Sequence, residues 1–147
     1  MQAIESFTGK YRWMSNFHPV DIPFEGRTYM SVEAAYVAAK TLDETERKFI
    51  HSLPTSGKCK AFGRNGITLR YDWDHIKLGV MEQLLREKFK ERTDLATRLI
   101  ETGDCEIIEG NWWGDTFWGV CKGKGENHLG RLIMKIRSEL QQKINEK

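Results

Sequence analysis

Apolar residues at helical spacing dominate the chain after residue 30, and this pattern constrains the fold more than any other feature. Between residues 32 and 39 they recur at i, i+3, i+4 and i+7, which predicts an amphipathic helix, and Ser31 occupies a typical N-cap position before it. The same reasoning predicts further helices that begin at Asp43, at Asp72 or Asp74, at Thr93 and at Asn127. The chain is therefore expected to be mostly helical.

A few short strands are expected beside these helices. Ile22–Phe24 and Arg27–Tyr29 flank Gly26 and predict a small hairpin, and Cys105–Ile108 has the composition of a short strand. The fold class that we predict is α+β, predominantly helical, with a few short strands. A length of 147 residues with no internal repeat or linker predicts a single compact domain over residues 1–147.

Composition excludes several classes of function. The net charge is +2 and no polybasic run occurs, which argues against a duplex-DNA binder that works by phosphate neutralisation. No stretch approaches 18 apolar residues and the N-terminus lacks the features of a signal peptide, so we expect a cytoplasmic protein without a membrane span. Three widely spaced cysteines do not suggest a disulfide framework, and the four histidines show no metal-ligand spacing. We expect neither a metal nor a cofactor.

The segment Ser31–Lys40 carries an acid and an amine on one predicted helix face. Glu33 and Lys40 lie seven residues apart, so their Cα atoms would be about 10.5 Å apart in a helix, with Tyr36 between them. A lysine that is partly desolvated there would have a lowered pKa and could act as a nucleophile. The alternative is an ordinary helix whose Glu33 and Lys40 are both solvated.

A second segment concentrates tryptophan between glycines. Trp112, Trp113 and Trp118 lie within seven residues, where flat apolar faces could stack on a base and Asp115 would be a carboxylate held among aromatic rings. A small aromatic core with an exposed turn aspartate explains the same residues. Earlier in the chain, Trp73 between two acids could line a pocket or serve as an apolar residue at a helix start.

A glycine-rich segment that leads into the last predicted helix could bind phosphate. Lys122, Lys124 and the backbone N–H groups near Asn127 would supply the positive charge and the donors. The alternative is a surface connection that ends in an asparagine cap.

Together these motifs resemble one known family, the NADAR superfamily of YbiA-like proteins. The resemblance covers essentially the full chain, with motifs in the family's order at compatible spacing. The matching segments are Phe7-x-Gly9, Ser15-Asn16-Phe17, Gly26-x-x-Tyr29-x-Ser31-Val32-Glu33-x-x-Tyr36-x-x-x-Lys40, Trp73-Asp74 with Lys77 and Met81, Asn111-x-Trp113-Gly114-x-x-x-x-Trp118-Gly119, and Gly125-x-Asn127-x-Leu129-Gly130. Two positions depart from the family pattern: Val37 replaces an expected glutamine and Met14 a common leucine, and Val37 puts the substrate class in doubt.

The resemblance implies an N-glycosidase that cleaves the bond between ribose C1 and an amino-linked base. Two substrate classes are implied, ADP-ribosyl-guanine and the ribosylamino-pyrimidine phosphates of riboflavin biosynthesis. The expected partner is thus a small-molecule or nucleotide-linked ribosyl substrate, or ADP-ribosylated nucleic acid, with no membrane and no obligate protein partner. The matching residues suggest Lys40, Glu33 and Asp115 as catalytic groups. They suggest these substrate-binding residues: Asn16, Tyr36, Trp73, Trp113 and Asn127. The glycine-rich segment adds Lys122 and Lys124 as residues that would hold phosphate.

Two mechanisms and a second class of function stay open at this level. Lys40 could form a Schiff base with the sugar while Glu33 moves protons, or Glu33 or Asp115 could direct water onto C1 while Lys40 acts electrostatically. A non-catalytic module that binds ADP-ribose or another NAD-derived nucleotide is the alternative to an enzyme. It would not require both Glu33 and Lys40.

Overall fold

The computed structural model describes residues 2–146, which form two compact units. The first, here the 16–88 unit, contains Asn16–Lys88; the second, here the terminal unit, contains residues 2–15 and 89–146. The fold is α+β and predominantly helical, as predicted. The single domain over residues 1–147 stays a prediction, and Met1 and Lys147 lie outside the described residues. Among the described residues, no helix has the length and apolar character needed to cross a membrane.

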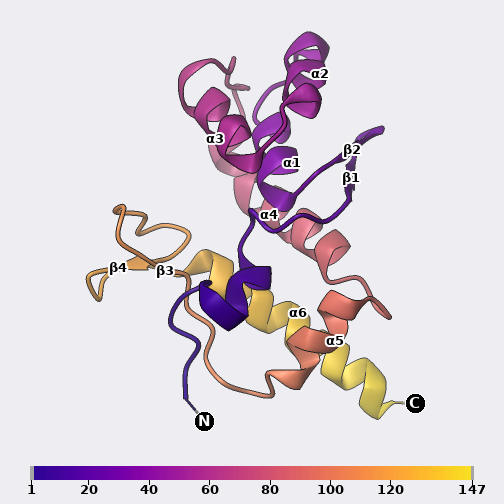
Figure 1. Cartoon of the computed structure of the whole chain (residues 1–147), viewed down its shortest axis with the longest axis vertical. Coiled ribbons are helices and arrows are strands. Elements are labelled where there is room, and N and C mark those ends of the chain that lie inside the picture. Colours follow the sequence, from indigo (N-terminus) through magenta and orange to yellow (C-terminus); the bar gives the residue numbers. More distant parts are fainter. Residues whose placement is uncertain (1, 147) are drawn as a thin grey trace. The chain divides into compact units, whose positions relative to one another are not determined.

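The 16–88 unit packs its other elements around one short helix (Figure 1). Its elements are β1 (Ile22–Phe24), β2 (Arg27–Tyr29), α1 (Val32–Ala39), α2 (Glu44–Ser52), α3 (Ser56–Asn65) and α4 (Trp73–Lys88). Helix α1 contacts α2, α3, α4 and both strands. The expected hairpin is confirmed, since β1 and β2 pair antiparallel with Ile22 opposite Tyr29. Gly26 turns the chain between them at a φ of 89°.

Helix α1 differs from the amphipathic helix that its spacing predicts. Every residue of α1 except Glu33 is buried. Elements cover it on several sides, so an apolar stripe on one face is not enough, and four alanines allow close packing. Ser31 is the N-cap as predicted, and its hydroxyl accepts a hydrogen bond from the Ala34 N–H at 3.1 Å.

Local sequence signals predicted helix α2 but not helix α3. Asp43 caps α2 as predicted and accepts a hydrogen bond from the Glu46 N–H at 2.9 Å. Glu46 does not complete a reciprocal capping box, because its carboxylate accepts bonds from Thr68 instead. The sequence analysis missed α3, which has few apolar residues and two internal glycines. One of them, Gly63, lies so close to α1 that an added Cβ would be 2.9 Å from Val37.

Helix α4 begins at Trp73, directly after one of the two expected caps. The Asp72 carbonyl accepts a hydrogen bond from the His75 N–H at 3.0 Å. The Asp72 carboxylate is paired with Arg70 at 2.7 Å. The position and the start of this helix were therefore predicted correctly, and the Asp72 side chain pairs with Arg70.

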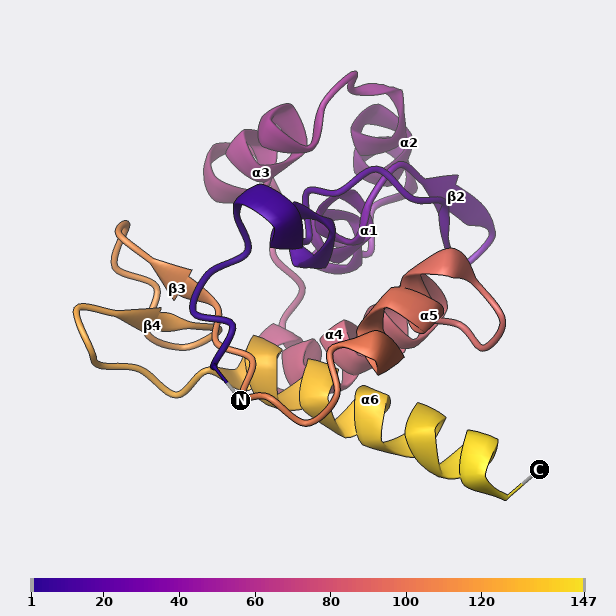
Figure 2. The ribbon, with the colours of Figure 1, turned by 60° about the horizontal axis from the view of Figure 1, so that its bottom comes forward.

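The terminal unit contains a 3-10 helix η1 (Gly9–Met14), α5 (Asp94–Glu101), β3 (Gly110–Asn111), β4 (Val120–Cys121) and α6 (His128–Asn145). Figure 2 shows α5 packed beside α6, an arrangement that their contacts confirm. The cap at Thr93 is confirmed. Gly103, shortly after the end of α5, has a φ of 73°. The strand expected over Cys105–Ile108 is wrong: only Ile107 pairs there, in a single parallel bridge to Ile4.

Helix α6 begins after Asn127, as predicted. Leu129, Ile133 and Ile136 are buried on it, whereas Leu132 is only partly buried. Strands β3 and β4 are parallel and two residues long, and they close the tryptophan-rich loop between them. This loop and the glycine-rich turn after β4 precede α6 in the chain.

Candidate functional site

The carboxyl end of α1 is held rigidly in place. Lys40 is the C-cap residue of α1, and its carbonyl accepts a hydrogen bond from the Arg70 N–H at 2.7 Å. The buried Arg47 guanidinium donates to the Ala38 carbonyl at 3.1 Å and to the Thr41 carbonyl at 2.9 Å. These bonds satisfy carbonyl groups that a helix end otherwise leaves without partners. They also fix the backbone from which the Lys40 amine projects.

The surroundings of Lys40 favour its neutral form. Burial lowers the pKa of Lys40, Glu33 opposes that change with its negative charge, and Arg64, Lys60 and Lys77 lower the pKa further with their positive charges. The amine lies 5.3 Å from the ring centroid of Tyr36. An amine of lowered pKa beside a carboxylate is the pair required for covalent catalysis on a carbonyl or imine carbon. The structure thus agrees with a partly desolvated lysine and contradicts the fully solvated alternative.

Aromatic and amide groups lie on the same helices and the adjoining loop. Tyr36 and Trp73 are both buried and meet edge to face, with ring centroids 5.1 Å apart. Asn16 accepts a hydrogen bond from the Glu33 N–H on its backbone carbonyl at 3.0 Å. Within the described part of the chain its side-chain oxygen is buried without a hydrogen-bond partner. Such an oxygen can accept a bond from a ligand.

Five predicted site residues thus share the 16–88 unit. They are Asn16, Glu33, Tyr36, Lys40 and Trp73. The remaining five lie in the terminal unit, and they are Trp113, Asp115, Lys122, Lys124 and Asn127. The second group divides into residues that line a pocket and residues that shape its loops.

Asp115 organises the tryptophan-rich loop. Its carboxylate accepts hydrogen bonds from the Phe117 N–H at 3.1 Å and the Trp118 N–H at 2.9 Å. The Asn111 side chain bonds both backbone groups of Asp115. Its oxygen accepts from the Asp115 N–H at 3.0 Å, and its amide nitrogen donates to the Asp115 carbonyl at 2.8 Å. The sequence analysis did not assign Asn111 to the site. Its position in Asn-x-Trp-Gly-Asp, with a turn glycine before the aspartate, was the available signal.

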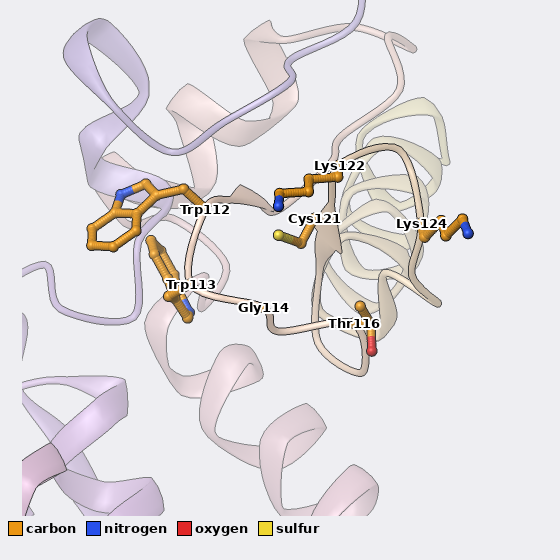
Figure 3. Close-up of a pocket in the computed structure, with 7 residues that line it drawn as sticks. All are labelled: Trp112, Trp113, Gly114, Thr116, Cys121, Lys122 and Lys124. Carbon is orange, nitrogen blue, oxygen red and sulfur yellow. The ribbon is translucent and has the colours of Figure 1, made fainter.

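A pocket of about 640 Å³ opens between the tryptophan-rich loop and the glycine-rich turn (Figure 3). Its lining residues are Trp112, Trp113, Gly114, Thr116, Cys121, Lys122 and Lys124. Trp112 is 84% and Trp113 50% exposed, and their rings meet at nearly a right angle with centroids 5.6 Å apart. In Figure 3 the Lys122 ammonium points toward the two tryptophans and the Lys124 ammonium points away from them. The pocket therefore combines exposed aromatic faces with at least one inward amine.

Asn127 is buried and does not belong to the lining of this pocket. Its side-chain oxygen accepts from the Glu109 N–H at 3.0 Å, and its amide nitrogen donates to the Ile107 carbonyl at 2.9 Å. Its backbone is left-handed, with a φ of 55°, and its side chain makes no capping bond to α6. Asn127 thus ties the 107–109 segment to the start of α6.

The comparisons with known proteins agree with this fold and these motifs. The model of the NADAR domain matches residues 5–141. This chain belongs to the NADAR family. It is 34% identical over 137 residues to the N-glycosidase YbiA of Shigella boydii, covering 92% of this chain and 85% of that protein. It is also 34% identical to an N-glycosidase of Nostoc punctiforme, over 88% of this chain and 86% of the relative.

Two further NADAR comparisons concern a longer protein and a solved structure. A riboflavin biosynthesis protein of Vibrio vulnificus is 35% identical over 132 residues, which are 88% of this chain but only 36% of that protein. The solution structure of the Escherichia coli protein YbiA superimposes with a TM-score of 0.85 at 31% identity, covering all of this chain and 90% of the other. The resemblance expected from the motifs is confirmed.

The described residues of this NADAR chain contain no cluster of three or more histidine, cysteine, aspartate or glutamate side chains suited to a metal ion. The three cysteines are free and buried. Burial raises the pKa of the Cys59 thiol, which disfavours a reactive thiolate there.

Proposed function

We propose that this NADAR protein is an N-glycosidase that cleaves the bond between ribose C1 and an amino-linked base. Its substrate is either an ADP-ribosyl-guanine or a ribosylamino-pyrimidine phosphate of riboflavin biosynthesis. The names of its relatives support the activity. The observation that carries the proposal is a lysine of lowered pKa held at the end of the helix that also bears Glu33.

The proposed reaction begins with the lone pair of the amino nitrogen. That lone pair opens the sugar ring to an imine between C1 and the base nitrogen. The neutral Lys40 amine adds to C1, Glu33 transfers a proton to the base nitrogen, and the C1–N bond to the base then breaks. Water adds to the resulting C1=N bond to Lys40 and releases the sugar aldehyde and the free lysine. No oxidant or reductant is consumed.

Substrate contacts follow from the chemistry of the other side chains. Asn16 offers its unpartnered oxygen to a sugar hydroxyl, and Tyr36 and Trp73 supply an apolar wall beside Lys40. Trp113 offers a half-exposed ring on which a base can stack. Lys122 supplies positive charge in the same pocket as Trp113.

Three residues of the terminal unit have more indirect proposed roles. Asp115 keeps its loop in shape through the Phe117 and Trp118 N–H groups, and its carboxylate is proposed to stabilise positive charge that develops on the sugar. Lys124 contributes to the electrostatic field of the pocket that it lines. Asn127 orients the start of α6. The N–H groups there do not suit the expected phosphate contact, because those of His128 and Leu129 donate to the Phe117 and Trp118 carbonyls at 3.2 Å and 2.9 Å.

A product assay with borohydride tests the proposal. Each candidate substrate is incubated with the protein, with and without borohydride. Chromatography detects the released base, and intact mass with peptide mapping detects an adduct. We expect release of the base from at least one substrate and a reduced sugar adduct on Lys40. Lys40→Ala should lose the adduct and release, by about 10³-fold or more, whereas Lys58→Ala, on exposed α3 surface, should behave as wild type.

The other outcomes separate the alternatives. Release without an adduct would replace the Schiff base by water attack that Glu33 or Asp115 directs. A fully active Lys40→Ala variant would exclude covalent catalysis by this lysine. Absence of release from both substrates would contradict the proposed activity.

A further inference from the structure

A single buried side chain of α2 binds the backbone of α1 on both sides of Lys40. The Arg47 Nε–H donates to the Ala38 carbonyl at 3.1 Å and to the Thr41 carbonyl at 2.9 Å. Ala38 lies two positions before Lys40, and Thr41 directly follows it. Arg47 therefore contacts the chain before and after the residue whose amine is proposed to react.

The turn that Arg47 binds ends α1 in hydrogen bonds of the 3-10 type. The Lys40 N–H donates to the Val37 carbonyl at 3.1 Å. The Thr41 N–H donates to the Ala38 carbonyl at 3.3 Å. Bonds to the third residue before have poorer geometry than those of an α-helix, and helix ends fray. A donor from outside the helix can therefore decide which conformation this turn adopts.

The Arg47 guanidinium is itself held by the β1–β2 hairpin. Its Nη1 donates to the Glu25 carboxylate at 2.8 Å, and the group lies 5.3 Å from the ring centroid of Phe24. Glu25 has a left-handed φ of 43° in the turn between the two strands, which is uncommon for a residue other than glycine. Bonds to the hairpin on one side and to α1 on the other leave the Arg47 side chain little freedom to move.

Stability alone does not account for an arginine at this position. The Arg47 side chain is 6% exposed, whereas that of its ion-pair partner Glu25 is 53% exposed. Within the described part of the chain, the Arg47 Nη2 is buried without a hydrogen-bond partner. A buried charge that is only partly paired costs free energy, which an apolar side chain of similar volume would avoid. What the arginine adds is a donor for the two carbonyls beside Lys40.

We propose that Arg47 is a positioning residue for Lys40, which fixes the last turn of α1 and so keeps the Lys40 amine in one place beside Tyr36. The amine lies 5.3 Å from the Tyr36 ring centroid. This role rests on the proposed N-glycosidase function, in which the amine adds to ribose C1. A displacement of about 1 Å can slow a reaction by about 10²-fold, because the reacting atoms must be close and aligned. A loosened turn would keep the amine and spread it over several positions.

Arg47→Lys separates positioning from charge. It keeps a positive charge near Glu25, but one ammonium replaces the planar group that reaches two carbonyls and a carboxylate at once. We expect kcat and kcat/KM to fall together by about 10–100-fold with KM unchanged, the pattern of an interaction lost in the transition state. Steady-state kinetics measure this at a temperature at which circular dichroism shows the variant to be folded.

Glu25→Gln reaches Arg47 from its other side without changing a buried position. Loss of the carboxylate charge weakens the bond that holds the guanidinium, so kcat should fall in the same direction and by less than in Arg47→Lys. Arg27→Gln is the matched control, because it removes the other ion pair between the hairpin and α2, with Glu44, and should leave kcat unchanged. An effect of Arg27→Gln equal to that of Glu25→Gln would contradict a specific role of Arg47.

Ile50→Ala controls for lost stability. Ile50 is 1% exposed on the same helix, and its truncation lowers the free energy of unfolding by about 2–5 kcal/mol. The bonds from Arg47 to the α1 carbonyls stay in place, so we expect a kcat close to that of the wild type while the variant is folded. A loss of kcat as large as in Arg47→Lys would overturn the positioning role, since lost stability would then explain both.

A second readout does not depend on N-glycosidase activity. Each protein is incubated with ribose 5-phosphate and cyanoborohydride, and peptide mapping measures the rates of adduct formation at Lys40 and at the exposed Lys58. Arg47→Lys should lower the rate at Lys40 by about tenfold or more and leave the rate at Lys58 unchanged. An unchanged kcat together with an unchanged rate at Lys40 would overturn the proposal. If the wild type releases no base, the proposed function fails, and the trapping rates still decide whether Arg47 positions the amine.

Discussion

The 16–88 unit and the terminal unit present their candidate functional groups in opposite ways. In the first, Glu33 and Lys40 project from a helix whose other side chains are buried. Hydrogen bonds from the Arg47 guanidinium and the Arg70 N–H fix the end of this helix. In the second, Trp112 and Trp113 stand exposed on a loop, which Asp115 and Asn111 hold in shape. Burial changes the acidity of an amine, whereas exposure leaves an aromatic face open to a ligand. This difference supports the proposal that the helices supply the chemistry and the loop the recognition.

The largest expected effect tests whether Glu33 moves protons. Glu33→Gln keeps the side-chain size and should lower kcat by about 10²–10⁴-fold, the usual contribution of a general acid or base. Its loss of charge further lowers the pKa of Lys40, so a shortage of neutral amine cannot explain a slower reaction. Steady-state kinetics measure the effect. Glu44→Gln, on the exposed surface of α2, serves as the control and should stay within about twofold of wild type.

The next effect tests recognition by the loop. Trp113→Ala should raise KM by about 10–100-fold, because stacking on a base contributes about 1–3 kcal/mol. Trp112 is the more exposed of the two and its replacement by Ala should raise KM less. Trp113→Phe should restore most of the affinity. A larger effect at Trp112 than at Trp113 would transfer the stacking role to Trp112.

A third prediction concerns the other buried amine of the 16–88 unit, Lys88. Burial lowers the pKa of Lys88 to about 7. Between this value and the ordinary lysine value the unfolded chain binds a proton that the folded chain does not, so the free energy of unfolding rises with pH. The rise is at most about 1.4 kcal/mol per pH unit, and urea unfolding from pH 7 to 9 measures it. Lys88→Met should flatten this slope; a slope equal to that of the wild type would exclude Lys88 as its source.

The smallest effect concerns the charges that face Lys40. These are Glu33 from α1, Lys60 and Arg64 from α3, and Lys77 from α4. Arg64→Gln removes one positive charge and should raise the pKa of Lys40. The pH at which borohydride trapping of a sugar aldehyde reaches half its maximum should then rise by less than about one unit. Lys58→Gln should leave that midpoint in place, and a lower midpoint in Arg64→Gln would contradict the sign.

Most helices of this protein were predictable because their starts are encoded locally. Ser31, Asp43 and Thr93 cap helices through bonds to N–H groups three residues later, and such bonds need only a short segment of chain. Helix α3 escaped prediction because Cys59 and Gly63 replace a regular apolar stripe where it packs on α1. The strand expected at Cys105–Ile108 is absent because strands need partners, and only Ile4 pairs there.

The candidate site likewise contains residues that the sequence indicated and residues that only the structure revealed. Motifs led to Glu33, Lys40, Trp73 and Trp113 because their residue types and order match the family. They gave no indication of Arg47, which holds the end of α1, or of Lys60 and Arg64, which belong to the helix that was missed. Asn127 and Asp115 were assigned to binding and catalysis, and their hydrogen bonds give each of them a structural role as well.

The sequence by itself determined the family, the mostly helical fold and the acid–amine pair of α1, since caps, spacing and motif order are local properties. Only the tertiary structure decided how acidic the Lys40 amine is and which charges surround it. Both depend on burial and on cations that α3 and α4 bring from 20 to 37 residues further along the chain. Desolvation and charge act through space, and spacing along one helix does not reveal them.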